Sequence, residues 1–510
     1  MENSRTRNTF YNALGGILVK FFNIFSAFAI RTVFIYTLGI EYAGISSVFT
    51  DILTVLSFAE LGIGTAITYA LYKPIAEGNT EKISQLMTVF KKVYSVIAIS
   101  ILGLGLLLVP FLDKIITNVP NVKENLTVIY CLYLLETSTS YLLIYKSTFL
   151  TAYQKDYLVS KIKVVFSVLK FIVVCLTLIL THSFIIYLVA SIIIGILQNI
   201  SIAIKAEKEF PLLKSKSNIP LSEEEKKTII NDVKALMLYK VSGTVLNGTD
   251  SIITSVILGT PVVGVLGNYN LISNQVSGFL MQIFGATAAS IGNLAVTSSA
   301  EHQRNIFNRM LFLCFWFYCI CATCLWVLFN PFMFIWQGSE RLFDNITVTC
   351  LVIDFYIKGL MSPVTQFRTS NGLFVQGKYR PLIMAILNIG ISIILAKRIG
   401  ISGIILGTII SRALTQLWYD PLLIYRKVFS YPVRSYIIKY IGYFFVTAVS
   451  CCISKTLFNL YLSNCGFIGI IIGACLCCFV SCMLVVLVYS RKIEFRETLE
   501  LIKRVIKRNL

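Results

Sequence analysis

The stretch Asp232–Val265, DVKALMLYKVSGTVLNGTDSIITSVILGTPVVGV, decides the fold that we expect for this chain. It is long and apolar, yet it carries Lys240 and, further along, Asp250. A shift of 220 residues towards the N-terminus places Lys240 on Lys20. The same shift keeps a second set of residues in register, with Leu258, Gly259 and Gly264 falling on Leu38, Gly39 and Gly44. The pattern predicts a duplicated membrane protein with a charge at the same depth in each copy.

The composition of the whole chain supports a membrane protein. Of its 510 residues 56% are hydrophobic and only 14% are charged, and the mean hydropathy is +0.78. Soluble proteins carry about 25% charged residues. Apolar stretches of about 20 residues, the length that crosses a bilayer as a helix, recur about fourteen times. We therefore expect an all-α polytopic protein with about fourteen transmembrane helices.

The net charge of +20 has a distribution that argues against nucleic-acid binding. Most of the 45 lysines and arginines fall in alternate loops and in both termini. Positive charge of this kind marks the cytoplasmic side of a membrane protein and is attracted to anionic lipid headgroups. We expect a multi-pass membrane protein with both termini in the cytoplasm.

The chain divides into two similar halves. We expect six-helix bundles over residues 1–204 and 232–425, joined by a cytoplasmic linker over 205–231. Helices thirteen and fourteen follow over 426–490, and an amphipathic cytoplasmic tail covers 491–510. A second match supports the repeat, since Gln154 and Tyr157 correspond to Gln376 and Tyr379 at an offset of 222. Six spans per copy give both copies the same orientation, so the pseudo-two-fold axis is expected along the membrane normal, with a substrate site between the halves.

Lys20 and Lys240 are the best matched charges within the spans. Charges inside a membrane are costly and mark functional sites. Two ammonium groups facing one aqueous cavity would attract an anion such as a diphosphate. Alternatively, both lysines extend towards the inner headgroups.

Two polar stripes accompany the lysines. One in the second span includes Thr54, Ser57 and Glu60, and one in the eighth includes Asn270, Asn274 and Gln282. Their hydroxyl and amide groups suit hydrogen bonds to sugar hydroxyls. Close helix packing is the competing interpretation.

Other charges within the spans are interpreted as supporting the site. Asp250 is interpreted as neutralising a neighbouring lysine, although proton uptake or cation binding stays open. Glu60, Glu136 and Arg412 are interpreted as charge-balancing or coupling residues. Asp354 and Lys358 lie four residues apart, the spacing of an intrahelical ion pair.

The sequence contains no motif for enzymatic chemistry. It has no phosphate-binding loop of the form GxxxxGK[ST], no HExxH and only two histidines. Cys321 and Cys324 have CxxC spacing without a second pair, so we expect neither a metal nor a cofactor. Transport energy would have to come from an ion gradient, the membrane potential or downstream consumption of the product.

Three segments resemble the polysaccharide repeat-unit flippases of the multidrug, oligosaccharidyl-lipid and polysaccharide exporter superfamily. They are FIYTLGIEYAGISSVFTDILTVLSFAELGIGTAI at 34–67, NGTDSIITSVILGTPVVGVLGNYNLI at 247–272 and QGKYRPLIMAILNIGISIIL at 376–395. The resemblance implies a V-shaped cavity between two six-helix bundles. In relatives that flip the peptidoglycan precursor, basic residues on spans one and seven line this cavity, and Lys20 and Lys240 lie on the corresponding spans. Spans thirteen and fourteen are implied to form a groove for a lipid tail.

The resemblance implies that the protein moves an undecaprenyl-diphosphate-linked oligosaccharide from the inner to the outer leaflet of the bacterial cytoplasmic membrane for capsule or related polymer assembly. Partners expected on this basis are the lipid-linked oligosaccharide, membrane lipids, a polysaccharide polymerase and glycosyltransferases. A cation-coupled multidrug exporter of the same fold and a non-transporting scaffold for glycosyltransferases are the alternatives.

Overall fold

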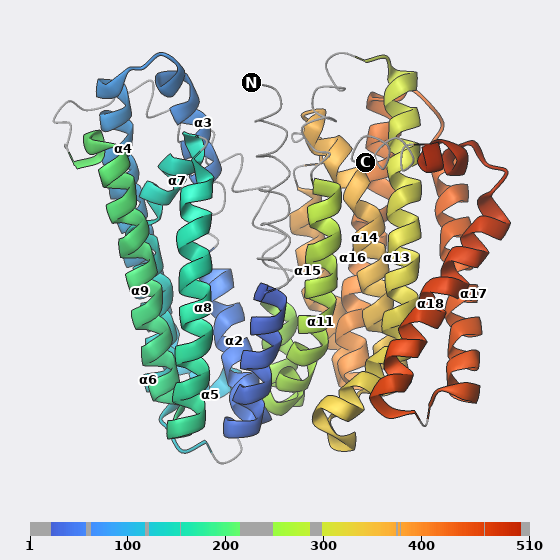
Figure 1. Ribbon diagram of the computed structural model, residues 1–510, viewed down its shortest axis with the longest axis horizontal. Coiled ribbons are helices and arrows are strands. Elements are labelled where there is room, and N and C mark those ends of the chain that lie inside the picture. Colours follow the sequence, from blue (N-terminus) through green and yellow to red (C-terminus); the bar gives the residue numbers. More distant parts are fainter. Residues whose placement is uncertain are drawn as a thin grey trace. The chain divides into compact units, whose positions relative to one another are not determined.

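A computed structural model describes residues 22–57, 63–117, 122–153, 155–214, 248–285, 298–373, 376–377, 379–463 and 465–500. These residues are almost all helical and include no β-strand (Figure 1). Ten of the described helices are long and apolar enough to cross a membrane. Two shorter apolar helices, Phe22–Leu38 and Gly248–Leu258, accompany them. The prediction of an all-α polytopic membrane protein is therefore confirmed.

The chain forms two compact units, residues 1–267 and 268–510. In the first unit the helix Phe22–Leu38 is followed by eight further helices: α2 (Ile40–Leu56), α3 (Ile63–Ala76), α4 (Thr80–Leu108), α5 (Leu112–Ile115), α6 (Leu126–Tyr141), α7 (Ile144–Ala152), α8 (Asp156–Thr181) and α9 (Phe184–Glu209). Short 3-10 turns cover Val109–Phe111 and Pro211–Lys214, and the helix Gly248–Leu258 leads into α11 (Thr260–Gly285). Because α11 crosses residue 267, its first two turns belong to the first unit.

Polar side chains cap two helices of the first unit at the residue just before each helix begins. Asn79 accepts a hydrogen bond from the Lys82 amide at the start of α4, and Asn125 accepts one from Thr127 at the start of α6. Such caps satisfy amides that a helix leaves unpaired. Between the helices, Phe49 of α2, Tyr130 of α6 and other aromatic side chains form a continuous buried core.

In the described part of the second unit, six long helices follow α11: α13 (Ala300–Gln337), α14 (Asn345–Ser370), α15 (Arg380–Ile399), α16 (Ile401–Lys427), α17 (Arg434–Tyr461) and α18 (Gly466–Tyr489). A 3-10 turn, Ser339–Arg341, joins α13 to α14. Helix α13 packs against α14, α17 and α18, while α14 and α15 pack against α16 (Figure 1). Helices α13 and α14 are the most buried of the candidate spans, which makes them the centre of this unit.

Part of the C-terminal tail packs on the second unit. Residues 493–500 are helical, and Phe495 is buried against Phe312 and Trp316 of α13. Two ion pairs hold the same segment, from Arg309 to Glu497 at 2.5 Å and from Lys439 to Glu494 at 2.7 Å. The apolar face of this part of the tail is thus covered by protein.

The chain breaks in the same way at the two positions that the repeat equates. The first apolar helix ends at Leu38 and the later one at Leu258, and the glycine that follows each has a positive φ, 104° at Gly39 and 96° at Gly259. A side chain is disfavoured in this backbone region, so glycine is required at both breaks. The next residue starts a new helix each time, α2 and α11.

Candidate functional site

Helices α2 and α11 cross at their first turns, where glycine lets the two backbones touch. A Cβ atom on Gly44 would overlap the carbonyl oxygen of Thr260, and one on Gly264 would lie 2.5 Å from the carbonyl oxygen of Ile40. The offset of 220 equates Ile40 with Thr260 and Gly44 with Gly264. The contact is therefore reciprocal, because each copy of the repeat presents a glycine to the same carbonyl of the other.

A cluster of polar side chains lies beside this crossing. Arg31, in the helix Phe22–Leu38, donates a hydrogen bond to the carbonyl oxygen of Gly264 at 3.3 Å. A Cβ atom on Gly267 would be 3.0 Å from both the Arg31 guanidinium and the Ser47 hydroxyl. The adjacent Ser46 shares a hydrogen bond of 2.6 Å with the Tyr133 hydroxyl. The first unit therefore holds a fixed cation and several hydroxyls where the two repeats meet.

Glu136 of α6 belongs to the same unit. Its carboxylate accepts a hydrogen bond from Ser191 of α9 at 3.2 Å and lies 3.7 Å from the ammonium of Lys170 in α8. Glu136 is thus a structural partner of two neighbouring helices. A coupling role for it stays a prediction.

The predicted stripe on α2 is present in the part that the structure describes. The Thr54 side chain is exposed and its hydroxyl donates to the Thr50 carbonyl at 2.7 Å, while Ser57 follows the last residue of α2 and is half-buried. A hydroxyl that donates to its own helix keeps its lone pairs for a ligand donor. The Thr54 hydroxyl is therefore available as an acceptor.

The predicted stripe on α11 is also solvent-accessible within the second unit. Asn274 and Gln282 are exposed, and Asn270 is half-buried. Whether these amides and the α2 hydroxyls contact one ligand stays a prediction.

The two predicted diphosphate-binding lysines, Lys20 and Lys240, lie outside the described residues, as does Glu60. Asp250 lies in the helix Gly248–Leu258 and is half-buried. The neighbouring Ser251 is hydrogen-bonded to the carboxylate of Asp51 on α2. Because Lys240 lies outside the described residues, the pairing of Asp250 with a lysine stays a prediction.

Within the described ranges, no group of three or more His, Cys, Asp or Glu side chains is placed to hold a metal ion.

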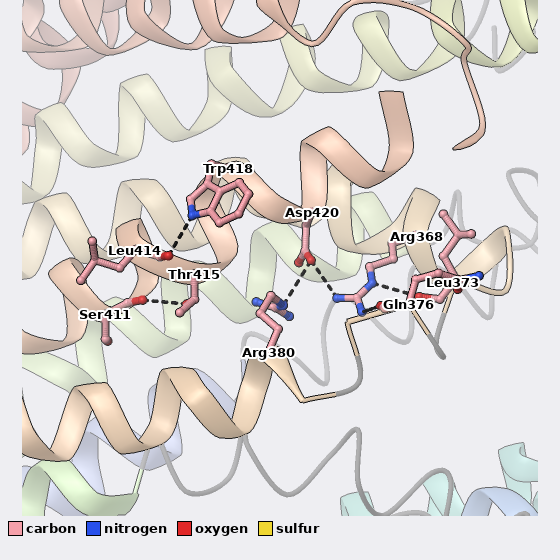
Figure 2. Close-up of polar contacts among 9 residues, drawn as sticks. All are labelled: Arg368, Leu373, Gln376, Arg380, Ser411, Leu414, Thr415, Trp418 and Asp420. Carbon is pink, nitrogen blue, oxygen red and sulfur yellow. Dashed lines mark hydrogen bonds and ion pairs between the residues drawn. The ribbon is translucent and has the colours of Figure 1, made fainter. Parts of the chain in front are cut away.

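Three ion pairs of the second unit connect α16 to α14 and to the start of α15. Arg412 of α16 lies 3.2 Å from Asp354 of α14. Further along α16, Asp420 accepts from Arg368 at 2.8 Å and lies 3.2 Å from Arg380 (Figure 2). The side chains of Arg368 and Asp420 are each only 1% exposed. Arg368 also donates to the carbonyls of Leu373 and Gln376, so it ties the loop after α14 to α16.

A related arrangement occurs in the first unit. Lys146 of α7, which the offset of 222 equates with Arg368, lies 2.5 Å from Glu207 near the end of α9. In the following turn, Lys155 lies 2.6 Å from Glu209, whose hydrogen bond and charge raise the pKa of Lys155. In both units, a basic residue that precedes the Gln-x-x-Tyr sequence is thus paired with an acid on α9 or α16. These two helices correspond to the sixth predicted span of each half.

An apolar cavity of about 180 Å³ opens between α13, α14 and α17. Its walls include Trp326, Tyr356, Phe444 and Ala448. It contains no charged lining residue, so it suits a hydrocarbon group.

Comparison with known protein families and with curated protein sequences finds no match. Solved structures do match. The lipid II flippase MurJ in its inward closed conformation covers 94% of this chain and 98% of its own, with 16% sequence identity and a TM-score of 0.67. The MATE transporter VcmN of Vibrio cholerae in its bent form covers 82% of this chain and 95% of its own, with 17% identity and a TM-score of 0.53. The MATE multidrug transporter DinF-BH covers 81% and 96%, with 18% identity and a TM-score of 0.54.

The chain has the fold of these membrane transporters. At this level of identity the likeness shows the fold alone, so membership of the superfamily that the sequence segments resemble stays a proposal. The narrower resemblance to polysaccharide repeat-unit flippases stays a proposal.

Sequence reasoning missed several charged residues of these sites. Arg31, near the end of the first predicted span, is not among the predicted site residues, yet it reaches the crossing of α2 and α11. Lys146 and Arg368 are not among them either, although the offset of 222 that equates the Gln and Tyr residues also equates these two. The offset of 222 was the signal that could have identified these two residues. A charge within a span is costly unless it is paired, so a charge that recurs at the same position of both halves indicates an ion pair in each.

Proposed function

We propose that the protein is a flippase that moves an undecaprenyl-diphosphate-linked oligosaccharide from the inner to the outer leaflet by alternating access. The observation that carries the proposal is the extent of the structural match. The lipid II flippase covers 94% of the chain, whereas the two MATE transporters leave about a fifth of it unmatched. The product would serve capsule or related polysaccharide assembly, with a polymerase and glycosyltransferases as partners.

The apolar cavity beside α17 supports a lipid-linked substrate. Helix α17 corresponds to the thirteenth predicted span, from which a groove for a lipid tail is expected, and Phe444 and Ala448 of this helix line the cavity. A polyprenyl chain gains about 0.8 kcal/mol for each buried CH₂ group, although lipid offers it a similar environment. The cavity would therefore position the tail more than it would hold it tightly.

The polar end of the substrate would be bound by charge and by hydroxyl and amide groups. Lys20 and Lys240 are proposed to hold the diphosphate, with Arg31 as an additional cation. The sugar would contact Thr54, Ser57, Asn270, Asn274 and Gln282. Glu60, Asp250, Glu136 and Arg412 would balance charge or couple transport to an ion.

A reconstituted flipping assay with a panel of lipid-diphosphate oligosaccharides tests this function. The double substitution Lys20→Ala and Lys240→Ala should abolish movement while the protein remains inserted and monodisperse. The matched control is Lys161→Ala with Lys163→Ala, two exposed lysines of α8. Wild-type flipping in the first double variant would reject the diphosphate site, and no flipping of any lipid by the wild type would favour a scaffold.

A cation-coupled multidrug exporter is the second candidate, because acids lie close to the crossing of the repeats. Asp51 and Asp250 occupy facing helices, and the carboxylate of Asp51 is hydrogen-bonded to Ser251, next to Asp250. An acidic site suits a cation or a proton. Drug efflux from cells expressing the protein, lost in Asp51→Asn and Asp250→Asn but kept in the lysine variant, would support this candidate.

A further inference from the structure

A second cavity, of about 780 Å³, lies entirely within the first unit. It is bounded by α4, α7, the end of α9 and the 3-10 turn Pro211–Lys214. These elements meet at the ends of the spans that the positive-inside rule assigns to the cytoplasm. The cavity is separate from the crossing of α2 and α11 and from the apolar cavity beside α17.

The charge of this cavity favours an anion. Its lining includes three lysines, Lys91, Lys92 and Lys146, and one acid, Glu207, which leaves an excess of two positive charges. Lys146 is buried and lies 2.5 Å from Glu207, so this pair fixes the inner wall. Lys91 and Lys92 are exposed on α4 and can reach a ligand.

The two lining hydroxyls on α4 do not change this preference. Thr88 donates to the carbonyl of Ser84 and Ser95 donates to that of Lys91, each at 2.9 Å. Their protons are used within the helix, so on α4 the ammonium groups of Lys91 and Lys92 are the lining donors that remain for a ligand. A compact ammonium group binds phosphate well as a point charge.

The surface next to the cavity carries exposed apolar side chains. Val96 lines the cavity and is exposed, and Ile99 and Leu107 further along α4 are exposed too. Gly103 lies between them, and nothing lies within 4 Å of the position where its Cβ atom would be. A ligand with its phosphate at the lysines would have an apolar surface available for acyl chains.

We propose that this cavity binds the phosphate headgroup of an anionic membrane phospholipid, with Lys91 and Lys92 contacting the phosphate and the acyl chains lying along α4. Basic pockets between helices at the cytoplasmic face are suited to such headgroups. The proposal does not rest on the proposed transport function. Its test needs no transport measurement.

The experiment uses the full chain in nanodiscs of phosphatidylcholine with or without phosphatidylglycerol. Amine-reactive footprinting of the wild type should show Lys91 and Lys92 protected several-fold by phosphatidylglycerol, with Lys161 and Lys163 unchanged. Native mass spectrometry should show retained phosphatidylglycerol, reduced about tenfold or more in affinity by Lys91→Gln with Lys92→Gln, as expected from the attraction of each lysine to an anionic lipid. The control pair Lys161→Gln and Lys163→Gln should bind as the wild type does.

Three outcomes would overturn the proposal. Equal protection of all four lysines would indicate general surface attraction. Displacement of the lipid by inorganic phosphate at similar concentrations would assign the cavity to a soluble anion. Stronger protection by undecaprenyl diphosphate than by phosphatidylglycerol would assign it to the lipid-diphosphate substrate.

Discussion

Asp420 is the residue on which the ion pairs at one end of the second unit depend. It faces both Arg368 and Arg380, so its removal leaves two cationic side chains close together without this carboxylate (Figure 2). Breaking a buried ion pair by removing one partner costs about 3–5 kcal/mol.

We predict that Asp420→Asn lowers the melting temperature of the purified protein markedly. The amide keeps the shape of the carboxylate but not its charge, so thermal unfolding in detergent measures the loss of the ion pairs. The control is Glu340→Gln, an exposed acid of the turn before α14, which should change the unfolding free energy by less than about 0.5 kcal/mol. Equal melting temperatures for Asp420→Asn and wild type would show that the ion pairs do not stabilise this unit.

A second residue-scale prediction concerns Glu494 and pH. Burial alone would raise the pKa of Glu494, but the hydrogen bond and charge of Lys439 outweigh burial and leave this pKa below its usual range. A lowered pKa in the folded state contributes stability above the unfolded value of about 4.3, and this contribution is lost as the pH falls through the folded value. Docking of residues 493–500 should therefore weaken below about pH 4.

Hydrogen exchange measures this docking. After correction for the intrinsic pH dependence of exchange, protection of residues 493–500 should fall on acidification, while peptides of α18 stay protected. In Glu494→Gln the protection should be lower at neutral pH and should change less with pH. Identical pH profiles for the variant and the wild type would contradict the role of this pair.

At the scale of elements, the crossing of α2 and α11 depends on the absence of side chains. Gly44→Ala or Gly264→Ala should force the helices apart, because the added methyl group meets a backbone carbonyl that cannot rotate away. Overpacking of this kind costs about 1–3 kcal/mol. The expected result is a lower yield of monodisperse protein and a lower melting temperature.

Gly103→Ala is the matched control for the glycine substitutions. Gly103 lies within α4, where a Cβ atom meets nothing within 4 Å. Alanine favours a helix over glycine by up to about 1 kcal/mol, so this variant should be as stable as the wild type or more stable. If Gly44→Ala behaved like Gly103→Ala, the close contact would not be a feature of the folded protein.

The elements themselves could largely be predicted from the sequence. Lipid requires about 20 apolar residues per span, so hydropathy marks the helices without knowledge of their partners. The ion pairs were harder to predict. Arg368 and Asp420 are 52 residues apart, and Lys146 and Glu207 are 61 apart, so each pair depends on how whole helices pack. The ion pair of Asp354 with Arg412 illustrates the same limit, since spacing within one helix can indicate only a partner on that helix, such as Lys358.

At the scale of the whole molecule, the proposed flippase function and the apolar cavity beside α17 together predict how substrate length would affect transport. Ala448→Trp should fill much of its 180 Å³ and slow the flipping of an undecaprenyl-linked substrate. A substrate with a short prenyl chain should be affected less, because it has less tail to place. Phe445→Trp, at an exposed position of the same helix, is the control. Equal slowing of long and short substrates would contradict a tail-binding role.

The glycine contact between the repeats also bears on how the two halves of the gene could diverge after duplication. A side chain added on one side meets a main-chain oxygen, which every amino acid has, so no exchange on the opposite side can make room for it. Where two side chains touch, a mutation of one can often be compensated by a mutation of the other. No such compensation is available at these two positions. The two copies of the repeat can therefore diverge at other positions, but each must keep glycine where its backbone touches the other copy.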